Sequence, residues 1–310
     1  MSKECKISII CHSILVATVI GLMIFLCFKN SDGVYYDLAL DHAIGDANNW
    51  FGILFRVVGE YPQYILIPIG GTILFYNADR INGKFGPILF RILSCFFIAA
   101  GLYIWVNNGT KSTDAGIPAA PLFAIFTIVF YGPIFLGIGY LVPKDVMHKL
   151  FKYGVFVLTF VVVSYIVMTV MKKCWCRMRY RDMLKEGNFD GFTPWYKLMM
   201  GRENKVEGYD YTSFPSGHTS SSAHIFAICL LPYYFKKLDK TWIKYTLYGV
   251  STAFVLIVAI SRVVNTAHFL SDTIIGGSFT YGIFYGLKYL FFRNGYEFKE
   301  KEVNNAVIQE

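Results

Sequence analysis

The sequence predicts an all-α fold, a polytopic transmembrane helical bundle with about eight spans. Hydrophobic residues make up 55% of the 310 residues, charged residues only 16%, and the mean hydropathy is +0.45. Long apolar runs also repeat from one end of the chain to the other, and about 20 apolar residues suffice for a helix to cross a bilayer. Tyrosine and phenylalanine are abundant, as expected where rings lie at the boundary between lipid and water.

Apolar runs give the order of the predicted spans. The second run is the least regular, because Pro62, Pro68, Gly70 and Gly71 interrupt it. Before it, residues 36–58 mix aspartates with aromatic residues, which favours a helix lying in the membrane interface. The approximate limits of the eight spans are residues 7–28, 61–77, 87–107, 118–142, 150–171, 216–236, 243–262 and 267–292.

Lysine and arginine gather at alternate connections, which the positive-inside rule assigns to the cytoplasm. Both termini are then cytoplasmic. One outward-facing connection, residues 172–214, departs from this rule because it begins with a cluster of basic residues. The cluster consists of Lys172, Lys173, Arg177, Arg179 and Arg181. The same count of spans brings the starts of the sixth and eighth spans to this outer face.

The net charge of +8 suits an anionic membrane surface or an anionic substrate. Nucleic acid is not expected as a partner, because the basic residues fall at helix ends and form no single polar stripe. The seven cysteines predict no disulfide framework, since most lie in or beside apolar segments. No metal site is expected at Cys174 and Cys176, which lack further ligands nearby.

A helix entry is predicted at Pro215-Ser216-Gly217-His218. Proline suits a first helical turn, serine caps it, and glycine allows a ligand to approach the backbone closely. Free amide groups and the helix dipole favour an anion at such a point. His218 would then lie beside that anion.

A second cluster of polar residues surrounds the start of the eighth span. His268 and Asp272 are four residues apart, so on one helix they share a face and can form a hydrogen bond. A carboxylate on one ring nitrogen fixes the tautomer and leaves the other nitrogen to attack. The alternative is a structural His–Asp pair, although an ionisable pair in a membrane segment favours function. Arg262 adds a cation.

Lys172 and Arg179 lie seven positions apart at the outer end of the fifth span. Taken alone they fit long side chains that snorkel at a helix end. Beside the two histidine motifs they fit an anion clamp, because guanidinium binds phosphate oxygens in pairs and ammonium supplies a compact charge.

Together, Lys172-x6-Arg179, Pro215-Ser216-Gly217-His218 and Ser261-Arg262-x5-His268-x3-Asp272 resemble the three-part signature of the type 2 phosphatidic acid phosphatase superfamily. This superfamily contains lipid phosphate phosphatases, undecaprenyl pyrophosphate phosphatases, glucose-6-phosphatases and vanadium haloperoxidases. The stretch around Phe192-Thr193-Pro194-Trp195 looks most like bacterial membrane members.

The resemblance covers roughly the second half of the chain and implies three regions. Residues 1–117 would form N-terminal membrane helices and the interfacial segment, and residues 118–292 a six-helix phosphatase-like catalytic core. Residues 293–310 would form a cytoplasmic tail. Two features depart from the family pattern: Tyr180 replaces the proline that usually follows the motif arginine, and five predicted spans precede the first motif where three are usual.

The resemblance also implies the role of each motif residue. His268 would be the nucleophile that takes the phosphoryl group, Asp272 would orient it, and His218 would protonate the leaving group. Neither a metal nor another cofactor is implied. Five residues would hold the phosphate oxygens: Lys172, Arg179, Ser216, Gly217 and Arg262.

The resulting hypothesis is an integral membrane phosphatase that hydrolyses a lipid phosphomonoester or pyrophosphate, such as phosphatidate or a polyprenyl pyrophosphate. Its site would face outward from a membrane, in the bacterial case the plasma membrane, with the bilayer and the lipid phosphate as partners. One alternative passes the phosphoryl group to another lipid or sugar. Another is a phospholipid-binding or transport protein without catalysis. The motifs do not specify the lipid or an oligomeric state.

Overall fold

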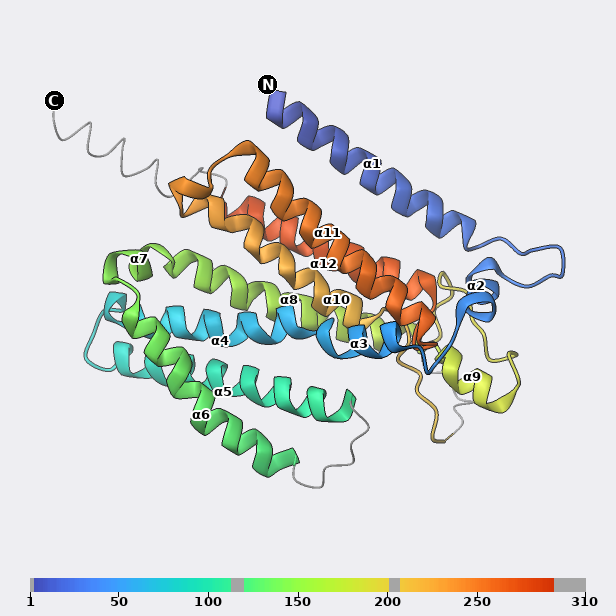
Figure 1. Cartoon of the computed structure of the whole chain (residues 1–310), viewed down its shortest axis with the longest axis horizontal. Coiled ribbons are helices and arrows are strands. Elements are labelled where there is room, and N and C mark those ends of the chain that lie inside the picture. Colours follow the sequence, from blue (N-terminus) through green and yellow to red (C-terminus); the bar gives the residue numbers. More distant parts are fainter. Residues whose placement is uncertain (1–2, 113–119, 201–206, 293–310) are drawn as a thin grey trace. The chain divides into compact units, whose positions relative to one another are not determined.

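The computed structural model describes residues 3–112, 120–200 and 207–292, and these residues confirm the all-α fold class (Figure 1). The described part contains α-helices and short 3-10 helices, and no β-strand. The predicted cytoplasmic tail, residues 293–310, lies outside the described residues.

Long helices occur at seven of the eight predicted spans. The length of each helix follows the length of its apolar run, because a turn without apolar residues gains nothing from burial. The seven are α1 (Lys3–Phe25), α4 (Tyr61–Tyr76), α5 (Gly86–Ser112), α6 (Ala120–Leu141), α8 (Phe151–Trp175), α11 (Thr241–Val264) and α12 (Leu270–Phe292).

The sixth predicted span, residues 216–236, is not one continuous α-helix. It consists of the short helix α10 (Gly217–Ala223) followed by the 3-10 helix η2 (His224–Tyr233). Four consecutive hydroxyl residues, 219–222, explain the break in part, because Ser and Thr side chains compete with the helix for backbone hydrogen bonds.

Shorter helices fill the connections. The predicted interfacial segment, residues 36–58, forms α2 (Tyr36–Ile44) and α3 (Trp50–Val58). The others are η1 (Ala78–Arg80), α7 (Lys144–Lys149), α9 (Tyr180–Glu186) and η3 (Lys236–Leu238).

Three helical segments in the described residues are long and apolar enough to cross a membrane: Gly86–Asn108, Phe151–Glu186 and Thr241–Val264. Two shorter apolar helical segments are Ile10–Phe25 and Thr127–Leu141. These helices support membrane association. The number of eight spans remains a prediction.

The chain divides into two compact units. Unit 1 consists of Met1–Phe55, Val167–Ser220 and Ile257–Phe279, and unit 2 of Arg56–Ile166, Ser221–Leu256 and Thr280–Glu310. Every predicted site residue belongs to unit 1.

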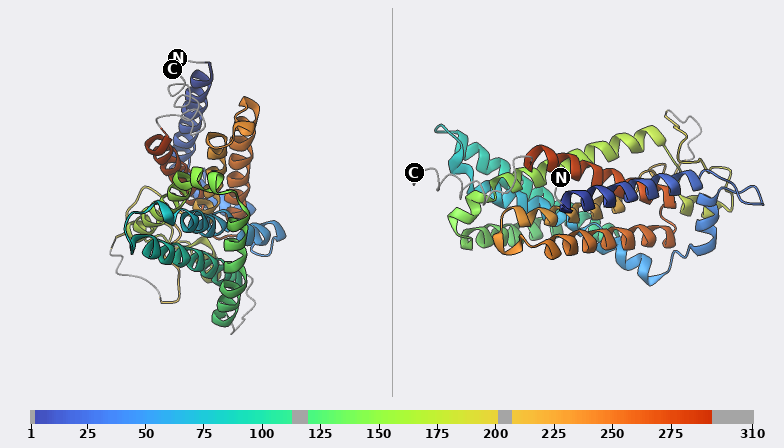
Figure 2. Two further views of the ribbon diagram at one scale, coloured as in Figure 1. Left: turned by 90° about the vertical axis from the view of Figure 1, so that its left-hand side faces the viewer. Right: turned by 90° about the horizontal axis from the view of Figure 1, so that it is seen from above.

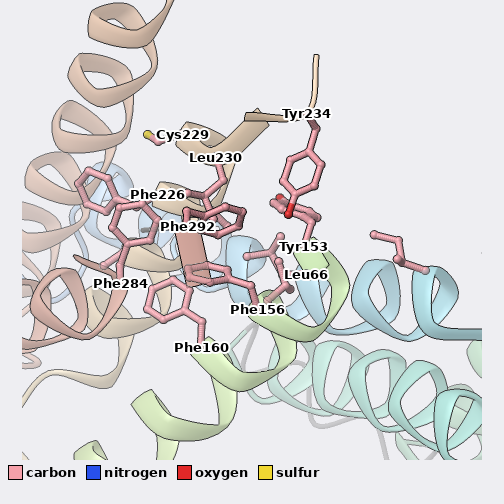
Figure 3. Close-up of a cluster of buried hydrophobic side chains, with 14 of the residues drawn as sticks. Leu66, Tyr153, Phe156, Phe160, Phe226, Cys229, Leu230, Tyr234, Phe284 and Phe292 are labelled. Carbon is pink, nitrogen blue, oxygen red and sulfur yellow. The ribbon is translucent and has the colours of Figure 1, made fainter. Parts of the chain in front are cut away.

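Within unit 2, an aromatic core joins residues from α4, α8, η2 and α12 (Figure 3). Phe156 and Phe160 are fully buried, and the ring centroids of Phe156 and Phe284 lie 6.0 Å apart in an edge-to-face contact. Helices α4, α5 and α6 of this unit lie side by side (Figures 1 and 2).

Within unit 1, a smaller apolar cluster forms around Leu38, Met178, Tyr180, Met183 and Phe269. Backbone contacts also connect the N-terminal segment to the end of α11. The Asp46 amide donates to the Val264 carbonyl over 2.7 Å, and the Asn265 side chain donates to the Ala47 carbonyl over 2.9 Å. Residues from the first fifty therefore help to hold the loop that carries the third motif.

Candidate active site

Unit 1 collects the three motifs at the ends of its helices. Lys172 lies in the last turn of α8, Arg262 in the last turn of α11, and Asp272 in the first turn of α12. His218 lies in the first turn of α10, and His268 lies between α11 and α12.

The imidazole rings of His218 and His268 face one another across a short gap. Their centroids are 6.5 Å apart and their planes are inclined by 58°. Both rings can therefore contact one phosphoryl group, although 50 residues of sequence separate the two histidines.

Ser213 fixes the tautomer of His268. The Nδ1 atom of His268 lies 2.8 Å from the Ser213 carbonyl oxygen, and because a carbonyl only accepts, Nδ1 carries the proton. In the neutral ring the lone pair is then on Nε2. The direct hydrogen bond expected from Asp272 is not formed, since its Oδ2 atom lies 3.6 Å from Nδ1, within the range of an ion pair.

Asp272 contacts His268 both directly and through Ser213. The Ser213 hydroxyl donates to Asp272 Oδ2, so one serine accepts from the histidine and donates to the carboxylate. Asp272 Oδ2 also accepts the backbone amide of Phe269 over 3.1 Å. This contact is the returning half of a capping box, and it fixes the start of α12 at Leu270. His268 consequently lies before the helix, whereas the sequence predicted it inside.

Burial and nearby cations disfavour the protonated form of His268. Burial, followed by Arg179, Lys172 and Arg262, holds the pKa of His268 well below its usual value.

The protein holds each of the three motif cations by a further contact. The Lys172 ammonium donates to the Thr212 carbonyl over 2.6 Å, and Arg262 donates to the Gly52 carbonyl. Arg179 Nε lies 2.7 Å from Asp210 Oδ2. A guanidinium has five N–H donors, so one such contact leaves the group able to bind phosphate.

Asp210 restrains Arg179, which is followed by Tyr180 and not by proline. The amide of Arg179 donates to the Asp210 carbonyl over 3.1 Å, in addition to the ion pair between their side chains. Tyr180 is buried at the start of α9. Although burial opposes it, Arg179 and the Thr212 hydrogen bonds lower the pKa of Asp210, which is therefore a carboxylate at neutral pH.

Ser216 caps α10, as the sequence predicted. Its hydroxyl accepts the Thr219 amide over 3.4 Å, and its own amide donates to the Asp272 carbonyl over 2.9 Å. A Cβ atom at Gly276 would lie 2.5 Å from the Ser216 carbonyl oxygen, so only glycine permits this approach of α12. A Cβ atom at Gly217 would lie 4.0 Å from Lys172 Cε, which brings the first and second motifs together.

Residues that the motifs did not indicate complete the site. Four of them contact motif residues or their partners through side chains or ion pairs: Ser213, Asp210, Arg177 and Asp37. Gly52 contacts Arg262 through its carbonyl. One signal was available in the sequence: two aspartates in the apolar segment 36–44 require partners if they are buried. Among the described residues, no group of three or more His, Cys, Asp or Glu is arranged to hold a metal ion.

Residues 153–296 match the family model described as the PAP2 superfamily. The matched range contains all eight predicted site residues and confirms the family predicted from the motifs. No curated protein and no solved structure matches the chain significantly.

Proposed function

Residues 153–296 match the PAP2 superfamily, and from this premise we propose that the chain is an integral membrane phosphatase acting on a lipid phosphomonoester or pyrophosphate. The superfamily includes phosphatases, which supports hydrolysis of a phosphoester. The long apolar helices support a membrane environment. The lipid substrate and the covalent mechanism are our proposals.

One observation carries the mechanism: His268 presents Nε2 as the basic nitrogen while Nδ1 is bound to the Ser213 carbonyl, and the His218 ring lies 6.5 Å away. A nucleophile needs a lone pair in a fixed direction, and a leaving group needs a proton donor on its other side. A buried neutral imidazole supplies the first and a neighbouring histidine the second.

In the first step, the Nε2 lone pair of His268 attacks phosphorus and forms a P–N bond. The bond between phosphorus and the leaving oxygen breaks, and His218, which in this mechanism is protonated once the phosphate dianion is bound, gives that oxygen its proton and becomes neutral. The phosphorylated His268 ring keeps its Nδ1 proton and is therefore positively charged, so the Asp272 carboxylate 3.6 Å from Nδ1 stabilises it.

In the second step, water attacks the phosphohistidine. His218, now neutral, takes a proton from the water as its oxygen bonds to phosphorus. The P–N bond breaks and its electron pair returns to Nε2, which regenerates His268 and releases inorganic phosphate. The atoms and charges balance without a cofactor.

Phosphate oxygens would be held by Lys172, Arg179 and Arg262, with the Ser216 hydroxyl and the Gly217 amide. These cations face increasing negative charge on the transferring group as the leaving bond weakens. Because Thr212, Asp210 and Gly52 already hold the cations, little reorganisation is required when substrate binds.

Lipid substrates fit this proposal better than soluble phosphates, because the site belongs to a chain with long apolar helices. By the positive-inside rule, the site would face outward from the membrane. A bacterial plasma membrane and cytoplasmic termini complete the proposed localisation.

A phosphate-release assay on the purified protein tests the proposal. The panel comprises phosphatidate, lysophosphatidate, phosphatidylglycerophosphate, diacylglycerol pyrophosphate and undecaprenyl pyrophosphate, each in detergent micelles with a metal chelator present. We expect release from at least one lipid and a loss of about 1,000-fold or more in kcat for His268→Ala.

His224→Ala is the matched control. His224 is fully buried in unit 2 with its ring 4.5 Å from Phe160, and its replacement tests a histidine outside the proposed chemistry. Full activity of His268→Ala would overturn the mechanism. Mass spectrometry of the products separates transfer to another acceptor from hydrolysis. Unchanged phospholipid binding in His218→Ala and His268→Ala, with loss of binding in Arg179→Gln, would instead indicate a phospholipid-binding protein.

A further inference from the structure

A buried chain of charges lies behind the proposed nucleophile. Arg177, in the short segment between α8 and α9, is 1% exposed. Its Nη1 atom donates to Asp272 Oδ1 over 2.6 Å, and its Nη2 atom donates to Asp37 Oδ2 over 2.9 Å. Both carboxylates are buried, and a buried charge is tolerated only when it is paired. Arg177 therefore connects α2 to the aspartate beside His268.

Ser271 closes this chain into a ring. The Ser271 hydroxyl accepts from Arg177 Nη1 over 2.7 Å and donates to Asp37 Oδ2 over 2.5 Å. The Ser271 amide donates to Asp37 Oδ1 over 3.0 Å. Since this amide lies in the first turn of α12, Asp37 satisfies a helix donor that has no partner within the helix. Asp37 thus fixes the turn that carries Asp272.

Two aromatic rings fix the plane of the Arg177 guanidinium. Its central carbon lies 4.0 Å from the centroid of Phe269 and 5.1 Å from that of Phe192. Cation–π contacts of this kind gain strength when the cation is desolvated. The guanidinium consequently has one orientation, and in that orientation it serves both aspartates.

Charge counting explains why two carboxylates share one guanidinium. Asp272 and Arg177 alone would be a neutral pair, and the ring of His268 would face little net charge. With Asp37 included, the three groups carry one negative charge. Asp41 lies near these groups, and burial, followed by Asp37 and Asp272, raises its pKa well above the usual value, which disfavours a further negative charge there.

We infer that Asp37 and Arg177 are positioning residues, which hold the Asp272 carboxylate in place and preserve its negative charge for the phosphorylated His268. The inference rests on the proposed role of His268 as nucleophile. It also gives the N-terminal segment a function in the reaction, although α2 lies outside the range matched by the family.

Asp37→Asn keeps the shape of the side chain and removes its charge, so it is the first test. We expect kcat to fall about 10- to 100-fold, as for other residues that orient a catalytic group, while KM changes about twofold or less. In an Asp272→Asn background, measured in single turnovers with excess enzyme, the same change should cost about twofold or less, because coupled residues are not additive.

Asp239→Asn is the matched control, since it breaks another ion pair of 2.6 Å, with Lys244, outside this network. Its kcat should remain that of the wild type. Ser271→Ala, which removes only the bridging hydroxyl, provides a milder variant if Asp37→Asn does not fold. An equal loss from Asp37→Asn in both backgrounds, or no loss from Asp37→Asn and Ser271→Ala, would overturn the inference.

A measurement without substrate separates this inference from the proposed function. In the NMR spectrum of ¹⁵N-histidine-labelled protein, assigned with His268→Asn, the Nδ1 proton of His268 should appear at low field. We expect this resonance to move upfield or vanish in Asp37→Asn and to remain in Asp239→Asn. That result supports positioning even if the wild type releases no phosphate from any lipid, an outcome that would remove only the proposed function. An unchanged resonance in Asp37→Asn would contradict positioning.

Discussion

Unit 1 and unit 2 bury different kinds of side chain. The core of unit 2 is aromatic, with Phe156, Phe160 and Phe284 fully buried (Figure 3). Unit 1 buries ionisable groups, among them Arg177 and Asp272, around a smaller apolar cluster. Apolar contacts are non-directional and tolerate small shifts, whereas each polar contact needs a partner at a set distance and angle. Substitutions should therefore separate stability in unit 2 from activity in unit 1.

The largest expected effect on stability is that of Phe156→Ala. The Phe156 ring is 5.6 Å from Phe291 and 5.8 Å from Phe292, so its removal leaves a cavity among rings. We expect the free energy of unfolding in detergent to fall by about 3–5 kcal/mol, with kcat per folded molecule unchanged.

Phe96→Ala serves as the control, because Phe96 of α5 is 63% exposed. Its free energy of unfolding should change by less than about 1 kcal/mol. A large loss of kcat in folded Phe156→Ala protein would show that the aromatic core takes part in the chemistry, and that stability and activity are not separated between the two units.

Gly276→Ala should affect activity more than stability. The new Cβ atom would lie 2.5 Å from the Ser216 carbonyl, so the second motif must shift away from α12. We expect kcat/KM to fall about 10- to 100-fold, because displacement of a positioned group by about 1 Å costs that much. A steady-state assay on the most active lipid of the panel measures this.

The same helix supplies the control for that substitution. A Cβ atom at Gly282 would meet nothing within 4 Å, so Gly282→Ala should retain wild-type kcat/KM. If both alanine variants lose activity equally, the effect comes from α12 as a whole and the close approach to Ser216 is irrelevant.

The smallest expected effect is a shift in pH dependence. Arg262 is one of the cations that lower the pKa of His268, and His268 must be neutral to attack. Replacing a neighbouring cation by a neutral group raises a histidine pKa, so in Arg262→Gln the acid limb of kcat/KM should move to higher pH, by about half a unit or more.

Arg181→Gln is the comparison for this profile. Arg181 is 43% exposed, and the main cations that lower the pKa of His268 are Arg179, Lys172 and Arg262. The acid limb of Arg181→Gln should therefore coincide with that of the wild type. A shift of the Arg262→Gln limb to lower pH would contradict the assignment of that limb to His268.

The sequence predicted the helices well because run length determines them. Seven long helices begin and end near the predicted limits. The sixth predicted span instead forms α10 and the 3-10 helix η2, in a stretch that contains four consecutive hydroxyl residues and Pro232. The residues of the proposed site were found through spacing, and the structure brings both histidines together. Their roles remain predictions.

The contacts within the site were not predictable in the same way. Asp37 and Arg177 are 140 residues apart, and no periodicity encodes a pairing over such a distance. The contact between Ser213 and His268 also depends on how two loops meet, which the spacing within either motif does not specify. The aspartates in the apolar segment 36–44 indicate that buried partners exist, but the sequence does not identify those partners.

The role of His268 as nucleophile is tested most directly by trapping the covalent intermediate. The wild-type protein is mixed with phosphatidate carrying a radioactive phosphoryl group, quenched in alkali within milliseconds, and digested for mass spectrometry. We expect a phosphoryl group on Nε2 of His268, formed and lost at the rate of turnover and absent from His268→Ala. Phosphate release that proceeds with no labelled His268, or with the label on another residue, would contradict that role.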